Sequence, residues 1–420
     1  MTKLTPAEQL QRIRRGVEEI VPEEELLERL GSGRPLRIKL GVDPTASDVT
    51  LGWAVVLRKL RHFQDLGHKA VLVIGDFTAQ IGDPSGKDST RKQLTKHEVD
   101  EFIERIQSQF FKILLPDPDL LEVRRNSEWL AELDVEDFVR RVASRIPLRR
   151  LIEREDFRSR LEKQAPLSLH EVLYPTFQAY DSVAIEADVE LGGRDQRLNL
   201  LIGRDLMEST RHVEPEFNTP SQVCIMMPLL IGLDGKEKMS QSLGNYISLV
   251  DEPNDMFGKA MSIPDELLSN YLELATDLPE ESYRAELERL ARGEGNPRDL
   301  KLELATELVR LYHGPDEALQ ARQFFIDTFS RKSVDREQVA QKPIPVEAFK
   351  DGVVSLPLLV ASLEFAKSNS AARKLIESGA VSLEGEKVTD PFATFESADL
   401  EGKLLRVGKH QFAVLTAPDP

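Results

Sequence analysis

The side chains best placed to do chemistry lie in two glycine- and aspartate-rich turns and on one predicted helix. GVDPT at 41–45 follows a short strand pattern, and GDFTAQIGDPSG at 75–86 follows a continuous apolar run. Tyr174 and Gln178 are spaced i, i+4 and Asp181 comes three residues later, which places the three side chains on one face of a helix. Carboxylates, an amide and a hydroxyl in such positions suit the binding of a polar ligand.

The hydrophobic pattern predicts the elements that must position these side chains. Residues 34–45 are typical of a short strand and a turn, a helical pattern follows, and 69–77 form an apolar, β-branched run. Strand, helix and strand in this order predict a parallel α/β sheet, which binds ligands at the carboxyl ends of its strands. Both turns lie at such ends. Helical periodicity dominates from about 97 to 170 and again from about 254 to 330.

Composition limits the possible functions. The chain has 420 residues, 72 acidic and 55 basic, with a formal charge of −17, so any RNA contact requires a local basic patch. Cys224 is the single cysteine, which excludes an internal disulfide and a cysteine-based zinc site, and its apolar flanks predict a buried, unreactive thiol. We expect neither a metal site nor a tightly bound cofactor. No apolar run is long enough for a membrane span and no signal-peptide pattern is present, so we expect a cytoplasmic protein without a membrane partner.

Six motifs then occur in one order along the chain. They are GVDPT (41–45), LGW (51–53), IGDFTAQIGDPSGK (74–87), YPTFQAYDS (174–182), LGGRDQRLN (191–199) and KMSQS (238–242). Each motif alone is weak, but their order and spacing resemble the bacterial tyrosyl-tRNA synthetases, a class I aminoacyl-tRNA synthetase family, over nearly the whole chain. The resemblance implies an α/β nucleotide-binding fold with a parallel sheet, followed by an α-helical domain and a small α+β S4-like domain.

The implied domains are a class I catalytic domain with a helical insertion (1–245), a helical domain of the anticodon-binding type (246–332), a linker (333–351) and an S4-like RNA-binding domain (352–420). In the last domain, Ser368 or Ser370 is a candidate helix cap and Gly379 a helix stop. The S4 resemblance implies RNA contacts by Arg373, Lys374 and Lys387. Acidic neighbours make this basic patch thin, so a folded module that binds no RNA is the alternative.

The resemblance also implies a tyrosine pocket with an anion for the α-ammonium group, an acceptor for the phenol and apolar walls. Asp83, Tyr174 and Gln178 match the ammonium-binding residues, and Asp181 matches the carboxylate that accepts the phenolic hydrogen bond. Such a site rejects phenylalanine, because this analogue leaves a buried carboxylate unpaired. The full set implied for tyrosine is Lys39, Asp43, Thr78, Asp83, Tyr174, Gln178, Asp181 and Gln196.

In this family the tyrosine carboxylate attacks the α-phosphate of ATP, and the tyrosyl group then passes to the tRNA 3′ end. Catalysis comes mainly from placing the reactants and from donors that stabilise charge on the phosphates. The matching catalytic positions are Thr45, Thr50, Trp53, Lys238 and Gln241. The matching ATP-binding positions are Gly41, Gly52, Gly193, Arg194, Asp195 and Lys238.

Several of these positions depart from the family pattern. Thr50 and Trp53 replace the two histidines of a His-x-Gly-His signature, and Gln241 replaces the second lysine of a Lys-Met-Ser-Lys-Ser loop. Thr50 is short and cannot be cationic, Trp53 is larger than histidine, and Gln241 has lost the charge. Arg194 stands where the family usually has a small residue, and its guanidinium either reaches phosphate or blocks the ribose pocket.

The sequence therefore predicts a tyrosine–tRNA ligase framework, with ATP-dependent activation weak or lost. L-Tyrosine, ATP with Mg²⁺ as a substrate if the enzyme is active, and tRNA-Tyr are the implied ligands. The resemblance also implies a homodimer, for which apolar residues between about 120 and 160 offer surface. Three classes stay open: an active ligase that tolerates the changes, a catalytically retired paralogue that binds tyrosine or RNA in a regulatory or other role, and a purely RNA-binding protein.

Overall fold

The computed structural model describes residues 4–83, 95–330, 339–350, 352–408 and 411–418. Contacts divide the chain into two compact units. The first comprises Met1–Val250 with Ser269–Glu280, and the second comprises Asp251–Leu268 with Glu281–Pro420. The predicted helical and S4-like domains both fall mainly in the second unit, and their division from one another stays a prediction.

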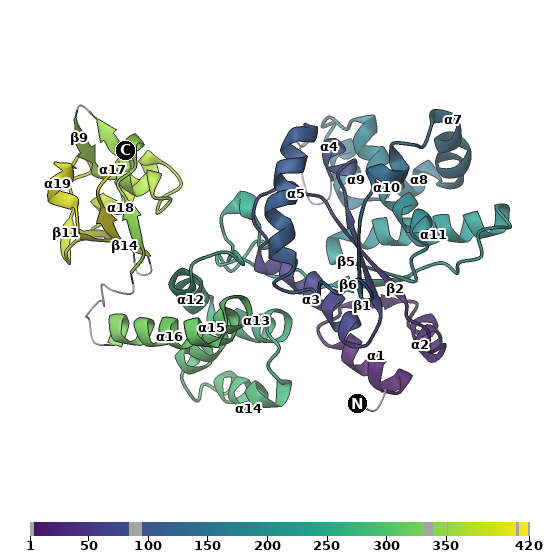
Figure 1. The fold of residues 1–420 in the computed structure, drawn as a ribbon, viewed down its shortest axis with the longest axis horizontal. Coiled ribbons are helices and arrows are strands. Elements are labelled where there is room, and N and C mark those ends of the chain that lie inside the picture. Colours follow the sequence, from purple (N-terminus) through teal and green to yellow (C-terminus); the bar gives the residue numbers. More distant parts are fainter. Residues whose placement is uncertain (1–3, 84–94, 331–338, 351, 409–410, 419–420) are drawn as a thin grey trace. The chain divides into compact units, whose positions relative to one another are not determined.

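The first unit is built on a six-stranded sheet with the strand order β1-β6-β5-β2-β3-β4 (Figure 1). Its strands are β1 (Glu19–Val21), β2 (Arg37–Val42), β3 (Lys69–Ile74), β4 (Leu121–Arg125), β5 (Val189–Gly193) and β6 (Val223–Met227). β1 pairs with β6 in antiparallel orientation, and all other neighbours in this sheet pair in parallel. β3 and β6 are buried along nearly their whole length, as expected for apolar strands covered on both faces. The predicted parallel α/β sheet is confirmed.

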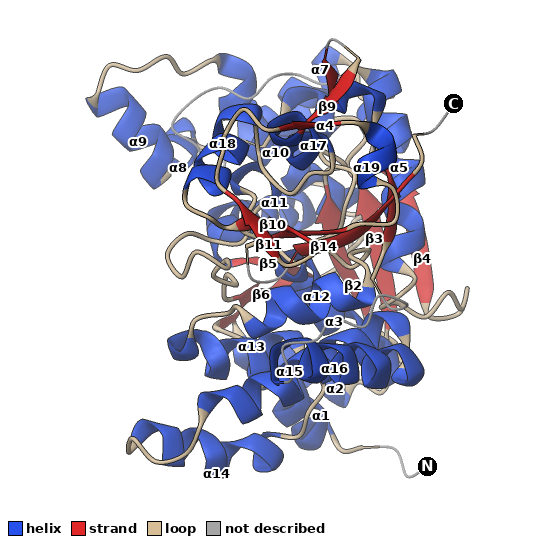
Figure 2. Ribbon diagram, turned by 90° about the vertical axis from the view of Figure 1, so that its left-hand side faces the viewer, coloured by secondary structure: helices blue, strands red, loops and turns tan. Residues whose placement is uncertain are grey.

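Helices cover both faces of this sheet (Figures 1 and 2). α3 (Leu51–Asp65) packs against β2, β3 and β5, while α11 (Arg197–Val213) packs against β5, β6 and α10 (Leu169–Ala184). From the boundary between β2 and β5, the sheet continues through β3 to β4 on one side and through β6 to β1 on the other. The crossovers from β2 to β3 and from β5 to β6 therefore run in opposite directions, and because both are right-handed they place α3 and α11 on opposite faces. The carboxyl ends of β2 and β5 therefore adjoin where the strand order reverses.

Polar side chains start three of the long helices. Thr50 caps α3, and the Ser168–Glu171 pair forms a capping box at the start of α10. Thr95 and Glu98 form another capping box at the start of α5 (Lys96–Phe110). Each cap satisfies a backbone N–H of the first helical turn, so the helix begins at a defined residue.

Shorter elements complete the first unit. They are α1 (Pro6–Arg14), α2 (Glu23–Gly31), α4 (Thr78–Ile81), α6 (Ser127–Leu130), α7 (Val135–Asp137), η1 (Phe138–Val142), η2 (Ala143–Arg145), α8 (Leu148–Ile152), α9 (Glu155–Glu162), η3 (Arg194–Gln196), η4 (Gln241–Leu243) and α13 (Leu268–Ala275). The stretch from 97 to 170, where helical periodicity dominates, also contains the edge strand β4, which pairs in parallel with β3.

The second unit begins with helices and ends in two small sheets. The helical elements are α12 (Pro253–Met261), η5 (Asp265–Leu267), α14 (Glu280–Ala291), α15 (Pro297–His313) and α16 (Pro315–Ser330). The C-terminal elements are β7 (Gln341–Pro343), η7 (Val346–Ala348), β8 (Phe349–Lys350), β9 (Val353–Ser355), α17 (Leu356–Ser362), α18 (Asn369–Glu377), β10 (Val381–Leu383), β11 (Glu386–Val388), β12 (Thr394–Phe395), α19 (Ser397–Leu400), β13 (Leu404–Val407) and β14 (Gln411–Thr416). One sheet has the order β11-β10-β13-β14-β7 and the other β12-β9-β8.

Two local predictions in the C-terminal part can be compared with the structure. Ser368 caps α18 by accepting a hydrogen bond from the backbone N–H of Ala371 at 3.2 Å, and Gly379 follows the helix with a left-handed φ of +68°. The predicted linker differs, because residues 341–343 and 349–350 form strands that pair with β14 and β9. Residues 331–338 and 351 of this region lie outside the described residues.

Cys224 lies in β6 with its side chain fully buried, and burial raises the pKa of its thiol far above the ordinary value. No helix in the described part of the chain is long and apolar enough to cross a membrane. Within the same residues, no group of three or more His, Cys, Asp or Glu side chains is arranged to hold a metal ion.

Candidate active site

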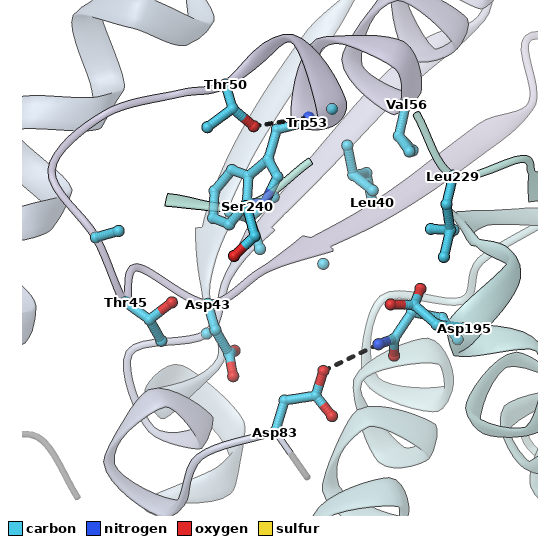
Figure 3. A pocket seen from close by; sticks show the side chains of 18 of the residues that line it. Leu40, Asp43, Thr45, Thr50, Trp53, Val56, Asp83, Asp195, Leu229 and Ser240 are labelled. Carbon is cyan, nitrogen blue, oxygen red and sulfur yellow. Dashed lines mark hydrogen bonds between the residues drawn. The ribbon is translucent and has the colours of Figure 1, made fainter. Parts of the chain in front are cut away.

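A cavity of about 740 Å³ lies in the first unit, at the carboxyl ends of β2, β3, β5 and β6. Open α/β sheets bind ligands at the point where the strand order reverses, and this cavity includes that point between β2 and β5. In Figure 3 the carboxylates of Asp43, Asp83 and Asp195 lie at one end, while Trp53 and Leu40 lie toward the other. All the predicted tyrosine, ATP and catalytic positions line the cavity except Lys39 and Arg194.

Asp43, in the turn after β2, is held between two hydroxyl donors. Tyr174 Oη donates to Asp43 Oδ2 at 2.9 Å and Thr78 Oγ1 donates to Asp43 Oδ1 at 2.7 Å. A Cβ atom at Gly75 would overlap both the Asp43 carboxylate and Thr78 Oγ1, so only glycine permits this close approach at the end of β3. Burial raises the pKa of the Asp43 carboxyl to about 7 despite the two donors.

Asp181, on α10, is fixed by two donors from the segment that follows β4. Trp129 Nε1 donates to Asp181 Oδ1 at 2.8 Å, and Asn126 Nδ2 donates to Asp181 Oδ2 at 3.3 Å. Burial raises the pKa of Asp181 to about 6, while Lys39, Trp129 and Asn126 act in the opposite direction. The carboxylate is therefore mostly ionised at neutral pH and is held in one orientation.

Asp83, Gln178 and Gln196 belong to one connected polar group in the cavity lining. Gln196 Nε2 donates to Asp83 Oδ2 at 2.9 Å. Asn199 Nδ2 donates both to Gln196 Oε1 at 2.8 Å and to Gln178 Oε1 at 3.0 Å. The side chains of Gln178 and Gln196 are thus oriented by one asparagine on α11.

Lys39 lies beneath the cavity, in β2. Its side chain is fully buried, and Nζ contacts Glu190 Oε1 at 2.9 Å, Ser182 Oγ at 2.8 Å and the Gln178 backbone oxygen at 2.9 Å. An ammonium group with these partners holds α10 against β5. Lys39 therefore lies outside the cavity lining, although it was predicted as a tyrosine ligand.

The positions expected to hold phosphates already have partners within the protein. Thr50 is 4% exposed, and its Oγ1 accepts a hydrogen bond from the backbone N–H of Trp53 at 3.4 Å. Gln241 Nε2 donates to the backbone oxygen of Asp48. Lys238 Nζ contacts Asp195 Oδ2 at 2.9 Å. The Lys-Met-Ser-Gln-Ser segment is thus bonded to both the turn after β2 and the segment after β5.

Arg194 takes neither of the two places suggested by its sequence position. Its side chain is 67% exposed, lies outside the cavity lining, and contacts Glu18 Oε1 at 3.4 Å. The guanidinium therefore neither lines the phosphate end nor fills the cavity in this structure.

The predicted RNA-binding side chains in the C-terminal part are all exposed. The Arg373 guanidinium lies 5.0 Å from the ring centre of Phe392, an aromatic side chain that is 68% exposed. Lys387 lies beside Gly379 at the end of α18. Arg373 thus lies in the middle of α18 and Lys387 beside its C-terminal end, and their role in RNA binding stays a prediction.

Comparison with known proteins places this site in a class. The sequence profile of the family described as tRNA synthetases class I (W and Y) matches residues 31–330, and that of the Tyrosine--tRNA ligase SYY-like C-terminal domain matches residues 335–415. Together with the parallel sheet and the cavity at its switch point, these matches define a class I tRNA synthetase.

Individual relatives identify the family within this class. The chain is 46% identical to the tyrosine–tRNA ligase of Moorella thermoacetica over 413 residues, covering 97% of this chain and 96% of the relative. It is 45% identical to that of Thermotoga maritima over 409 residues, 97% of each chain. The chain belongs to the tyrosine–tRNA ligase family. The solved tyrosyl-tRNA synthetase of Aeropyrum pernix shares the fold, with a TM-score of 0.60 at 23% identity over 78% of this chain and 100% of that one.

The structure adds site residues that the sequence analysis did not identify. Asn126 and Trp129 reach Asp181 from a segment of helical periodicity, and Asn199 orients the two glutamines. Asn199 was inside a recognised motif, and its i, i+3 spacing from Gln196 was a usable signal. Asn126 and Trp129 carry no such local signal, because only the pairing of β4 with β3 brings them to α10.

Proposed function

We propose that the cavity binds L-tyrosine within a tyrosine–tRNA ligase framework in which ATP-dependent activation is weak or lost. The α-ammonium group would be bound by Asp83, Tyr174 and Gln178, and the phenol by Asp181. Asp43, Thr78 and Gln196 support these groups. The observation that carries the proposal is the contrast between the two ends of one cavity. At one end Asp83, Gln196, Asn199 and Gln178 form a connected hydrogen-bonded group, and at the other Thr50, Trp53 and Gln241 stand in place of the family's phosphate donors.

The energetic argument for weak activation rests on three positions. Losing one well-placed transition-state donor costs about 3 kcal/mol, so three weakened donors cost on the order of 5–9 kcal/mol. Thr50 offers only one uncharged hydroxyl donor, because its Oγ1 accepts the bond from the Trp53 backbone N–H. Gln241 already uses one amide N–H on the Asp48 backbone oxygen, and Trp53 donates only through its indole nitrogen. We do not expect Arg194 to compensate, because it is exposed and lies beside Glu18. Any remaining activation of tyrosine would use ATP with Mg²⁺ as its substrate.

Tyrosine-dependent exchange of pyrophosphate into ATP tests the activation step. We expect the wild-type chain to exchange far below the roughly 1–10³ s⁻¹ of typical enzymes. Thr50→His, Trp53→His and Gln241→Lys together should raise exchange by several orders of magnitude, and each single change should do less, because the groups act on one transition state. Ordinary wild-type rates, or no gain in the triple variant, would refute the assignment of the defect to these positions.

Calorimetry tests tyrosine binding separately. We expect tyrosine to bind without ATP and phenylalanine to bind much more weakly, because the latter leaves Asp181 unpaired. No heat with tyrosine, or equal affinity for phenylalanine, would refute the tyrosine pocket. A catalytically retired paralogue that binds tyrosine or RNA is the second candidate, and the hydrogen bond from Gln241 Nε2 to the Asp48 backbone oxygen favours it.

We further propose tRNA-Tyr as a partner of the C-terminal part, through Arg373, Lys374 and Lys387. The exposure of all three side chains supports this proposal. Replacing Arg373 and Lys387 by glutamine should weaken tRNA-Tyr binding in a filter assay and reduce its salt dependence. Glutamine at Lys403, another lysine of the C-terminal part and not one of the three, is the matched control. If Lys403→Gln weakens tRNA-Tyr binding as much as the changes at Arg373 and Lys387 do, the assignment of RNA binding to these residues is wrong.

A further inference from the structure

A buried arginine outside the cavity lining is bonded to the asparagine that orients the two cavity glutamines. Arg154 directly precedes α9, is 6% exposed, and has its guanidinium 4.9 Å from the ring centre of Phe157. Its Nη1 donates to Asn199 Oδ1 at 3.0 Å. The segment between α8 and α9 thus reaches the tyrosine end of the cavity through one buried hydrogen bond.

The chemistry of the guanidinium fixes the orientation of this asparagine. A guanidinium group only donates hydrogen bonds, so the amide atom of Asn199 that faces Arg154 must be the oxygen. The NH2 group of Asn199 then faces the glutamines, and Nδ2 donates to Gln178 Oε1 at 3.0 Å and to Gln196 Oε1 at 2.8 Å. With Asn199 flipped, its oxygen would oppose both glutamine oxygens.

The far ends of this network are carboxylates, which favour the same orientation. Gln196 Nε2 donates to Asp83 Oδ2 at 2.9 Å, the dashed line that ends on Asp83 in Figure 3. Gln178 Nε2 donates to Glu190 Oε1 at 3.3 Å. An ionised carboxylate only accepts hydrogen bonds. A cation that only donates at one end and anions that only accept at the other therefore give every amide between them one direction.

This direction suits a ligand with an ammonium group. An amide oxygen accepts two hydrogen bonds, and Asn199 uses one of the two at Gln178 Oε1. The second is available to the α-ammonium group, which only donates. If the Gln178 amide were reversed, its NH2 group would face the ammonium group, and two donors would oppose one another.

We propose that Arg154 is a positioning residue for recognition of the tyrosine α-ammonium group and acts through Asn199 on the two cavity glutamines. The inference rests on the proposed tyrosine pocket and adds a residue that does not touch the ligand. Charge alone predicts the opposite effect: removing a buried cation should strengthen the binding of an ammonium group, because like charges repel. Loss of the fixed amide orientation should weaken it.

Calorimetry with the full chain near neutral pH tests the proposal with L-tyrosine and 3-(4-hydroxyphenyl)propionate, which is tyrosine without its ammonium group. The affinity for tyrosine divided by the affinity for the propionate measures recognition of the ammonium group. We expect Arg154→Met to lower this ratio at least about 10-fold, mainly through weaker tyrosine binding. If the wild type binds no tyrosine, the proposed function itself fails. A wild type that binds tyrosine, with a ratio that Arg154→Met leaves unchanged or raises, overturns this inference alone.

Two substitutions separate the donor from the packing. Arg154→Lys keeps a group that only donates, so it should retain most of the ratio, and an equal loss with lysine and methionine would overturn the proposal. Arg145→Met is the matched control, because the Arg145 side chain is 9% exposed and donates to Thr210 Oγ1 at 3.0 Å. Its other partner, Glu214, keeps Arg141. A ratio lowered as much by Arg145→Met would show general destabilisation and refute the specific role of Arg154.

The route through Asn199 has its own test. In an Asn199→Ala background, Arg154→Met should lower the ratio no further, because the residue through which it acts is already absent. A further loss of the full size would contradict this route. Thermal melting checks that each variant folds. If Arg154→Met does not fold, Arg154→Gln replaces it: an amide can turn either atom toward Asn199, so the ratio should still fall, and an unchanged ratio would overturn the proposal.

Discussion

Replacing Trp129 by phenylalanine should weaken tyrosine binding without changing the walls of the pocket. The indole nitrogen is the donor to Asp181 Oδ1 at 2.8 Å, and Asn126 is the other donor to this carboxylate. Phenylalanine keeps an aromatic ring beside Arg124, whose guanidinium lies 5.5 Å from the Trp129 ring centre. The substitution therefore removes one hydrogen bond, together with the part of the indole ring that packs against the cluster of Val71, Val73, Ile185 and Ala187.

The magnitude follows from the charge and burial of Asp181. A hydrogen bond to a charged group contributes about 1.5–3 kcal/mol, which corresponds to about 10- to 150-fold in an equilibrium constant. The same loss raises the pKa of Asp181, which burial already holds at about 6, by roughly 1–2 units. In the variant the carboxyl group should thus be substantially protonated at neutral pH, and it should accept the phenolic hydrogen bond less well.

Calorimetric titration of tyrosine across pH 5 to 9 measures both effects. Wild-type affinity should fall as the pH drops below about 6, where Asp181 becomes protonated, and the fall in the variant should begin at higher pH. Phenylalanine is the control ligand, because it makes no hydrogen bond to Asp181, and the variant should therefore bind it no more weakly than the wild type does. An unchanged tyrosine affinity and pH midpoint in the variant, with the fold intact by thermal melting, would refute the role of Trp129.

Three further outcomes are expected. The pKa of Asp43 is raised from 3.8 to about 7, so the folded wild type should lose about 2.5 kcal/mol of stability as the pH rises from 5 to 8. Asp43→Asn does not titrate and should gain this amount relative to the wild type, as chemical denaturation at each pH can measure. Lys39→Met should cost about 3–5 kcal/mol by leaving the buried Glu190 carboxylate without its cationic partner, whereas replacing both residues by methionine should cost much less. Sedimentation at micromolar concentration should give a dimer, since Val139 and Leu148 are more than half exposed in the stretch from 120 to 160, and a clean monomer would contradict this expectation.

Much of the fold followed from local pattern. The β-branched run before Gly75 predicted a strand buried on both faces, and the order of strand, helix and strand predicted a parallel sheet. Both were confirmed because hydrophobic periodicity reports burial directly. β4 was not predicted, since its sequence, LEVRR, is short and charged and only one strand neighbours it. Residues 341–343 were assigned to a linker because their strand depends on a parallel partner about 70 residues later.

The sequence by itself determined the residue types at the two ends of the cavity: the acids and amides for tyrosine, and Thr50, Trp53 and Gln241 in place of the family's phosphate donors. The order of the motifs was enough to predict these residue types, because the residues of each motif lie together in one local turn or on one face of a helix. Only the tertiary structure decided which side chains meet. It placed Lys39 under the cavity beside Glu190, brought Trp129 to Asp181, and turned Arg194 toward solvent. These contacts join elements far apart in the chain, and they depend on strand pairing and packing that no local spacing records.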